Sequence, residues 1–323
     1  MLATGVSLGQ MWHNIWSIVS IPDNVPIVLM LILVGFFAWW SFALAIRNDR
    51  LKRNVAKTAD GGIVDIFYPD SERGLPDKLH VWPYLVRIEF LAAILVTVFL
   101  IVWSVALDAP TEELANANAT PNPSKAPWYF LGLQEMLVYF DPWIAGVVMP
   151  TMIITGLMAI PYMDVNPKGS GYYTLRERPF AIGVFLFGFI ILWVSMVAIG
   201  TLVRGPGWMW FWPWEEWDPH RTISSTNVDL FEQLGFESWC IDFAGGKFDF
   251  FGLAAVGGFM FAGMTFPYLW LRKFHPEFYA RFGFVRYNVM MMHLLPMIGL
   301  LIKVVLRLAL NTKYVWITPW FNI

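Results

Sequence analysis

Apolar side chains run along most of the chain in long blocks, without the short alternation of half-buried strands. A helix needs about 20 apolar residues to cross a hydrocarbon core roughly 30 Å thick. Six blocks reach this length, and we expect them to span a membrane: Val25–Ile46, Ile88–Leu107, Trp143–Tyr162, Phe180–Val203, Phe251–Leu271 and Asn288–Leu310. The pattern therefore predicts an all-α fold, a polytopic membrane protein with about six transmembrane helices.

Basic residues are distributed unevenly between the segments that join these blocks. Lys and Arg number eight in 47–87, three in 163–179 and four in 272–286, whereas the two tails, 108–142 and 204–250 share five. Cytoplasmic loops of membrane proteins carry the excess of Lys and Arg. We therefore expect both termini to lie on the outer side of the membrane.

The composition narrows the classes of protein that remain. Hydrophobic residues make up 57% and charged residues only 14% of the 323 residues, which excludes a water-soluble enzyme. A formal net charge of −2 gives no sign of nucleic-acid binding. The single cysteine, Cys240, excludes a disulfide framework and a CxxCH covalent haem site within these residues.

The segment between the second and third spans has the most distinctive side chains. Prolines keep residues 121–127 extended, and apolar positions then recur at helical spacing, which predicts a short amphipathic surface helix. A proline-aromatic corner before such a helix makes a wall for a flat apolar ring with polar edges, as in a quinone head group. The candidate quinol-binding residues are Ala126, Pro127, Trp128, Tyr129, Phe130 and Leu133.

Several motifs occur in an order that resembles a known family. They are Leu75–Pro83, Lys125–Phe130, Leu133-Gln-Glu135, Gly156–Tyr162, Asn166-Pro167 and Arg176-Glu-Arg-Pro179. Over about residues 75–203 the chain resembles the C-terminal part of cytochrome b, in the split form called subunit IV of the cytochrome b6f complex. In that family a PEWY tetrapeptide lines the quinol-oxidation site.

The tetrapeptide differs here in its first two positions. Alignment on Trp128-Tyr129 places Ala126 and Pro127 where the family has proline and the glutamate credited with accepting a quinol proton. The nearest replacement is Glu135, a candidate general base, although a solvated surface acid is the alternative. The Tyr129 hydroxyl is a candidate to orient a quinol oxygen; the alternative is an interfacial aromatic anchor.

The histidines do not form the ligand set of a full-length cytochrome b, which holds two haems between paired histidines. We expect His13 and His220 in segments on the outer side of the membrane and His80 and His275 in inner loops. Only His293 lies within a predicted span. We expect no metal and no b haem on this chain. The resemblance implies a quinone at a shared site and three partner proteins: a b6-like dihaem subunit, a Rieske-type iron–sulfur protein and a c-type cytochrome.

Two basic residues lie inside the sixth span. Lys303 and Arg307 are four residues apart and share one helix face near its outer end. Charges at this depth usually pair or mark a site. A lipid phosphate, a haem propionate of a neighbouring subunit and an acid on another helix are the alternative partners.

Four regions follow from these patterns. We expect an extra helix and basic loop in 1–74, the subunit IV-like domain in 75–203, a Trp-rich acidic periplasmic segment in 204–250, and two extra helices with a tail in 251–323.

The leading hypothesis is a haem-free subunit of a quinol:cytochrome c oxidoreductase, catalytic only within its complex and placed in the bacterial inner membrane among its lipids. The first alternative is a structural membrane anchor of a respiratory or photosynthetic assembly, without quinol chemistry of its own. A transporter with Lys303 and Arg307 in its path lacks support from repeats or from charges in the other spans.

Overall fold

The computed structural model describes residues 7–56, 81–106, 114, 116–118, 120–164, 174–212, 214–215, 217–218, 220 and 227–323, with only the helical backbone described for 51–56. Within this part of the chain the six predicted spans are confirmed as long apolar helices. Their bounds are Val25–Arg50, Val81–Ala106, Ile144–Met163, Pro179–Leu202, Phe250–Phe274 and Phe284–Leu310. The protein is therefore a multi-pass, mostly helical membrane protein. His80, most of Leu75–Pro83 and Asn166-Pro167 lie outside the described residues.

The chain divides into two compact units. One comprises Trp16–Thr120 and Gly171–Gly183. It holds α2 (Val25–Ala56) and α3 (Val86–Ala106), with the turn η2 (Val81–Leu85) before α3, and only the end of α1 (Leu8–Val19), from Trp16 onward. No residue of α3 is buried, as expected of a helix whose side chains meet lipid or other proteins.

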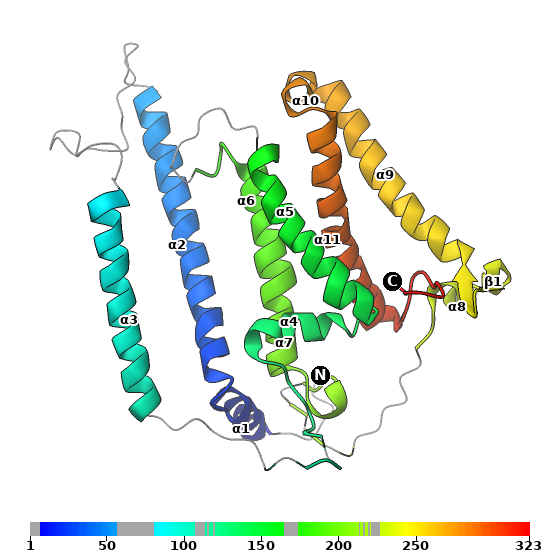
Figure 1. The fold of residues 1–323 in the computed structure, drawn as a ribbon, viewed down its shortest axis with the longest axis horizontal. Helices are drawn as coiled ribbons and strands as arrows, with labels where there is room; N and C mark the ends of the chain where they lie inside the picture. The colour runs from blue at the N-terminus through cyan, green and yellow to red at the C-terminus, as the bar shows by residue number, and fades with distance from the viewer. Residues whose placement is uncertain are drawn as a thin grey trace. The chain divides into compact units, whose positions relative to one another are not determined.

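The other unit comprises Met1–Ile15, Pro121–Ser170 and Val184–Ile323. It contains the third span of the chain, which is η3 (Ile144–Val148) followed by α5 (Met149–Met163). It also contains the fourth span from Val184 onward, which is the end of α6 (Pro179–Leu186), η4 (Phe187–Val194) and α7 (Ser195–Leu202). The last two spans are α9 (Phe250–Phe274) and α11 (Phe284–Leu310), joined by α10 (Pro276–Phe282). The predicted surface helix is α4 (Trp128–Met136), which crosses the end of α7 in Figure 1.

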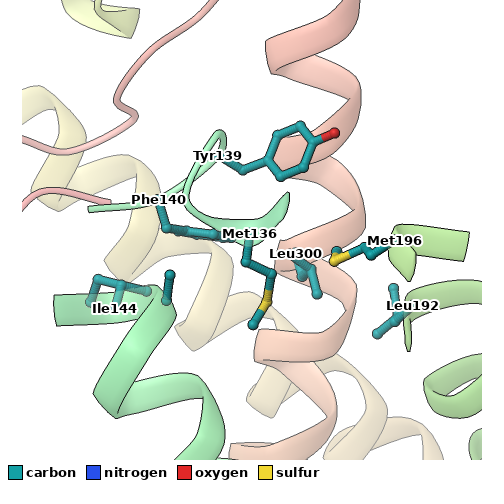
Figure 2. Close-up of a cluster of buried hydrophobic side chains, with 8 residues drawn as sticks. Met136, Tyr139, Phe140, Ile144, Leu192, Met196 and Leu300 are labelled. Carbon is teal, nitrogen blue, oxygen red and sulfur yellow. The ribbon is translucent and has the colours of Figure 1, made fainter. Parts of the chain in front are cut away.

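The main hydrophobic cluster of this unit brings α4 together with three spans. Figure 2 shows Met136, Tyr139 and Phe140, from the end of α4 and the turn after it, facing side chains of the spans. Ile144, Leu192, Met196 and Leu300 come from η3, η4, α7 and α11. The cluster therefore fixes α4 against membrane-spanning helices by burial of apolar surface.

The periplasmic segment predicted over 204–250 includes strands that the hydrophobic pattern did not predict. β1 (Cys240–Phe243) and β2 (Gly246–Asp249) pair in antiparallel register. Ala244 and Gly245 between them both have positive φ, the geometry of a tight hairpin turn. Three short helical turns lie before the hairpin in the chain: η5 (Pro206–Trp208), α8 (Leu230–Gln233) and η6 (Glu237–Trp239).

Candidate functional site

The first turn of helix α4 is exposed, and most of the rest of the helix is buried. Residues 128–130 are exposed, whereas Leu131, Gly132, Glu135 and Met136 are buried. The exposed turn is aromatic, and the buried part includes the charged Glu135.

The exposed first turn of α4 carries three neighbouring aromatic side chains, Trp128, Tyr129 and Phe130, which we call the aromatic row. The centroids of Trp128 and Tyr129 lie 5.8 Å apart, and those of Tyr129 and Phe130 lie 4.8 Å apart. Tyr129 is 51% exposed, and no hydrogen bond of its hydroxyl is recorded among the described residues. The row offers flat apolar surface together with one phenolic hydroxyl.

The extended loop before α4 is fastened to that helix by one side chain. The amide of Ala126 donates to Gln134 Oε1 at 2.7 Å, and Gln134 Nε2 donates to the Ser124 carbonyl at 2.8 Å. Pro127 then stands at the N-cap, where its missing N–H costs nothing. Ala126 and Pro127 thus lie beside the aromatic row. Leu133 lies one turn beyond Tyr129, but it is half-buried and packs against the main cluster.

The buried face of α4 lies directly on α7. A methyl group added at Gly200 would stand 3.0 Å from Leu131 Cγ, and one added at Gly132 would stand 3.4 Å from Val197 Cγ2. The two backbones approach closely because these positions lack a side chain, as at many contacts between membrane helices.

Glu135 is fully buried, and its carboxylate is surrounded by donors. Arg204, 6% exposed, donates from Nη2 to Oε1 at 2.7 Å and from Nε to Oε2 at 3.0 Å. Tyr139 donates its hydroxyl to Oε1 at 2.7 Å, and Trp208 donates Nε1 to Oε2 at 3.0 Å. Glu135 is therefore an ion-paired core residue, and its alternative as a solvated surface acid is excluded.

The geometry of this pair is the fork-to-fork contact that arginine makes with a carboxylate. Burial, and next to it the charge of Glu135, raises the pKa of the Tyr139 hydroxyl, which therefore stays a donor. With both carboxylate oxygens already accepting, Glu135 holds neighbouring groups in place.

Arg204 and Trp208 were not identified from the sequence. Arg204 directly follows the fourth span, where a basic residue is typical of a helix end that reaches into the interface. Its partner is 69 residues earlier in the chain, so no local spacing connects them. Arg204 is one of three basic residues in the otherwise acidic segment 204–250, so its charge alone did not distinguish it.

Lys125, just before the aromatic row, is held by α7 and the Trp-rich segment. Its Nζ donates to the Thr201 carbonyl at 2.8 Å and lies 5.2 Å from the centroid of the Trp217 ring. Burial lowers the pKa of the Lys125 ammonium to about 8. A cation at the last turn of α7 also interacts favourably with the helix dipole.

Lys303 and Arg307 both contact the segment that follows α11. Lys303 is 2% exposed; its Nζ donates to the Lys313 carbonyl at 2.6 Å and lies 5.9 Å and 5.7 Å from the Phe140 and Tyr314 ring centroids. Arg307 is half-buried and donates to the Asn311 carbonyl at 3.2 Å. Among the described residues no carboxylate lies within ion-pair distance of Lys303.

The histidine of the sixth span is engaged in packing between helices. His293 Nδ1 lies 2.7 Å from the Val289 carbonyl, and its Nε2 lies 3.1 Å from Thr155 Oγ1 on α5. In the part of the chain that the structure describes, no group of three or more His, Cys, Asp or Glu side chains is arranged to hold a metal ion.

A known family model matches the part of the chain that contains this site. The family model "Cytochrome b(C-terminal)/b6/petD" matches residues 114–211. The match begins before the loop and α4 and ends with the residues that follow Arg204, so it includes the aromatic row and the buried ion pair.

A curated relative is the menaquinol:cytochrome c reductase cytochrome c subunit of Geobacillus thermodenitrificans. It is 29% identical over 140 residues, which cover 40% of this chain and 54% of the relative. The chain thus spans about half the length of this relative. No solved structure matches.

Proposed function

We propose that the chain is a subunit of a menaquinol:cytochrome c reductase of the bc type, because residues 114–211 match the family model and overlap the resemblance seen over about residues 75–203. In this proposal it forms one wall of the quinol-oxidation site. Electrons leave the quinol through redox centres on other subunits, and its protons are released on the outer side of the membrane. The chain acts only within its complex.

The exposed aromatic row on α4 is the observation that carries this proposal. The rings of residues 128–130 face outward, whereas the rest of the helix is fixed by burial and by the ion pair. A head group stacking on the row would bring a quinol oxygen within reach of the Tyr129 hydroxyl, which can donate or accept. Ala126 and Pro127 would form the adjoining edge, and Leu133 would support the row from its half-buried position.

Two roles for Glu135 follow from different arguments. As the carboxylate nearest to the altered tetrapeptide, it remains a predicted general base. The geometry favours a positioning role, because proton uptake would weaken the bonds with Arg204 and Trp208. We expect Glu135→Gln to raise the KM for quinol more than it lowers kcat; a general base would show the reverse, with a changed pH profile.

The proposal includes partners with the redox cofactors. The quinone binds at a site shared between subunits, and a b6-like dihaem subunit, a Rieske-type iron–sulfur protein and a c-type cytochrome carry the haems and the cluster. The membrane is the bacterial inner membrane, with both termini on the periplasmic side. For Lys303 and Arg307 we propose that they fasten residues 311–314 to α11, and that Arg307 also binds a lipid phosphate.

The structural-anchor function is the second candidate, and one observation favours it. Proline stands where the family has its proton-accepting glutamate, and proline has no ionisable group. An anchor of this kind would keep α4 and its ion pair for assembly alone.

Tyr129→Phe separates the two functions because it removes the hydroxyl and keeps the ring. In the assembled complex we expect kcat/KM for a short-chain menaquinol to fall about 10-fold, as for loss of one positioned hydrogen bond. Tyr162→Phe, at the far end of α5, is the matched control and should have no effect. Unchanged quinol oxidation by Tyr129→Phe would favour the anchor.

A further inference from the structure

Residues 203–211, which we call the Arg204 turn, form a closed unit after α7. The amide of Phe211 donates to the Val203 carbonyl at 2.9 Å, and the amide of Gly205 donates to the Met209 carbonyl at 3.0 Å. Arg204 and Trp210 also form an isolated β-bridge. The turn is therefore closed by its own internal backbone bonds.

Two consecutive residues of this turn adopt left-handed backbone angles. Gly207 has φ +65°, which glycine adopts freely, but Trp208 has φ +57°. A bulky residue adopts these angles only at a cost in free energy. Such a conformation persists where neighbouring groups determine it, and this is often at functional sites.

The neighbouring groups that determine it belong to the loop and helix of the aromatic row. The amide of Gly207 donates to Asn122 Oδ1 at 2.5 Å, and Trp208 donates Nε1 to Glu135 at 3.0 Å. Arg204 donates to the Trp208 carbonyl at 3.2 Å while it forks onto Glu135. The Arg204 turn thus contacts the segment 122–135 at its first residue, Asn122, and at its last residue, Glu135. The aromatic row lies between these two contacts in the chain.

The Arg204 side chain is at the centre of these contacts. Its guanidinium bridges Glu135 and Trp208, and its Cζ lies 5.3 Å from the centroid of the Trp210 ring. Lysine could replace the charge but not the fork, because an ammonium cannot donate two parallel bonds and stack on a ring. The chemistry of the site therefore favours arginine over lysine.

We propose that Arg204 is a positioning residue for quinol: acting through Glu135 and Trp208, it sets the orientation in which α4 presents the Tyr129 row to the head group. The inference rests on the proposed function and extends it to a residue outside the quinol-binding segment. Arg204 does not touch quinol. Its loss turns or loosens α4, so its effect appears mainly in quinol binding.

Three variants of the assembled complex test this role, assayed with a short-chain menaquinol and normalised to the amount of complex. Arg204→Gln should raise the KM about 10-fold or more, since small misplacements at a binding site have large effects. Arg204→Lys should recover part of the loss. Trp208→Phe, which removes the Nε1 donor and keeps a smaller aromatic ring, should raise the KM about threefold with kcat nearly unchanged.

Arg286→Gln is the matched control. Arg286 donates Nε to the Tyr162 carbonyl at 2.9 Å and Nη1 to the Arg281 carbonyl at 3.1 Å, at the opposite end of α11. The variant Arg286→Gln removes an arginine that contacts several backbone carbonyls but has no recognised contact with residues 122–135. Its KM and kcat should equal those of the wild type.

The outcomes separate this inference from the proposed function. If Tyr129→Phe impairs quinol oxidation while Arg204→Lys and Trp208→Phe keep the wild-type KM, Arg204 is no positioning residue and the proposed function stands. If Tyr129→Phe is also without effect, the proposed function fails. Should Arg204→Gln not assemble, the KM values of Arg204→Lys and Trp208→Phe decide.

Discussion

Two buried cations of the same unit are held in different ways. Arg204 follows α7 and faces a fully buried carboxylate, whereas Lys303 lies within α11 and faces a carbonyl and two aromatic rings. Both bind a segment outside the spans: Arg204 holds α4, and Lys303 holds the residues after α11. Each cation thus fixes a segment outside the spans, Arg204 through a carboxylate of opposite charge and Lys303 through neutral groups.

These two arrangements should differ in their sensitivity to mutation. Removal of one member of a buried ion pair leaves the other charge without compensation. Removal of a cation held by a carbonyl and rings leaves only neutral groups, which lose a smaller favourable interaction. The α4 region therefore has a fixed geometry that depends on both members of the pair, and this suits the binding surface that we propose for α4.

The largest effect should come from breaking the ion pair on one side. Glu135→Ala leaves the Arg204 guanidinium buried without its carboxylate, and we expect a loss of about 3–5 kcal/mol in the stability of the full chain. Thermal unfolding of the purified chain in detergent measures this loss. Glu135→Gln with Arg204→Gln removes both charges and should cost less than Glu135→Ala; a double variant that costs more would contradict an ion pair.

A smaller effect is expected at the second cation. Lys303→Met keeps the length and apolar stem of the side chain while it removes the charge, and we expect a loss of about 1–2 kcal/mol from the bond to the Lys313 carbonyl and the two ring contacts. The same unfolding measurement applies. A loss as large as that of Glu135→Ala would mean that Lys303 has an acidic partner and that the contrast with Arg204 is wrong.

A third expected effect is a pH dependence contributed by Lys125. Burial lowers the pKa of this ammonium from 10.5 to about 8, so between these values the unfolded chain binds more protons than the folded chain. Stability relative to Lys125→Met should therefore rise as the pH increases from about 8 to 10.5, and the full cost of the buried charge should be present below pH 8. A stability difference that is constant from pH 7 to 10.5 would contradict this assignment.

The sequence predicts those parts of the molecule that depend on local patterns. The six spans follow from apolar length, and α4 follows from helical spacing after a proline-rich loop. The β1–β2 hairpin was missed because each strand has only four residues, too few for a distinct alternation.

At the site, sequence identified Tyr129 and Glu135 but could not predict the surroundings of Glu135. Arg204 and Trp208 lie 69 and 73 residues further along the chain, and only the packing of α4 on α7 brings them to the carboxylate. The spacing of Lys303 and Arg307 correctly places both near one end of α11, yet their carbonyl partners come from the turn after the helix.

Purification of the complex through a tag on this chain tests the proposed function most directly. A reduced-minus-oxidised optical spectrum and haem staining of the separated subunits would be recorded on the same sample. We expect b- and c-type cytochrome bands in the complex, oxidation of menaquinol by it, and no haem stain on this polypeptide. Absence of any cytochrome from the purified material would contradict membership of a menaquinol:cytochrome c reductase.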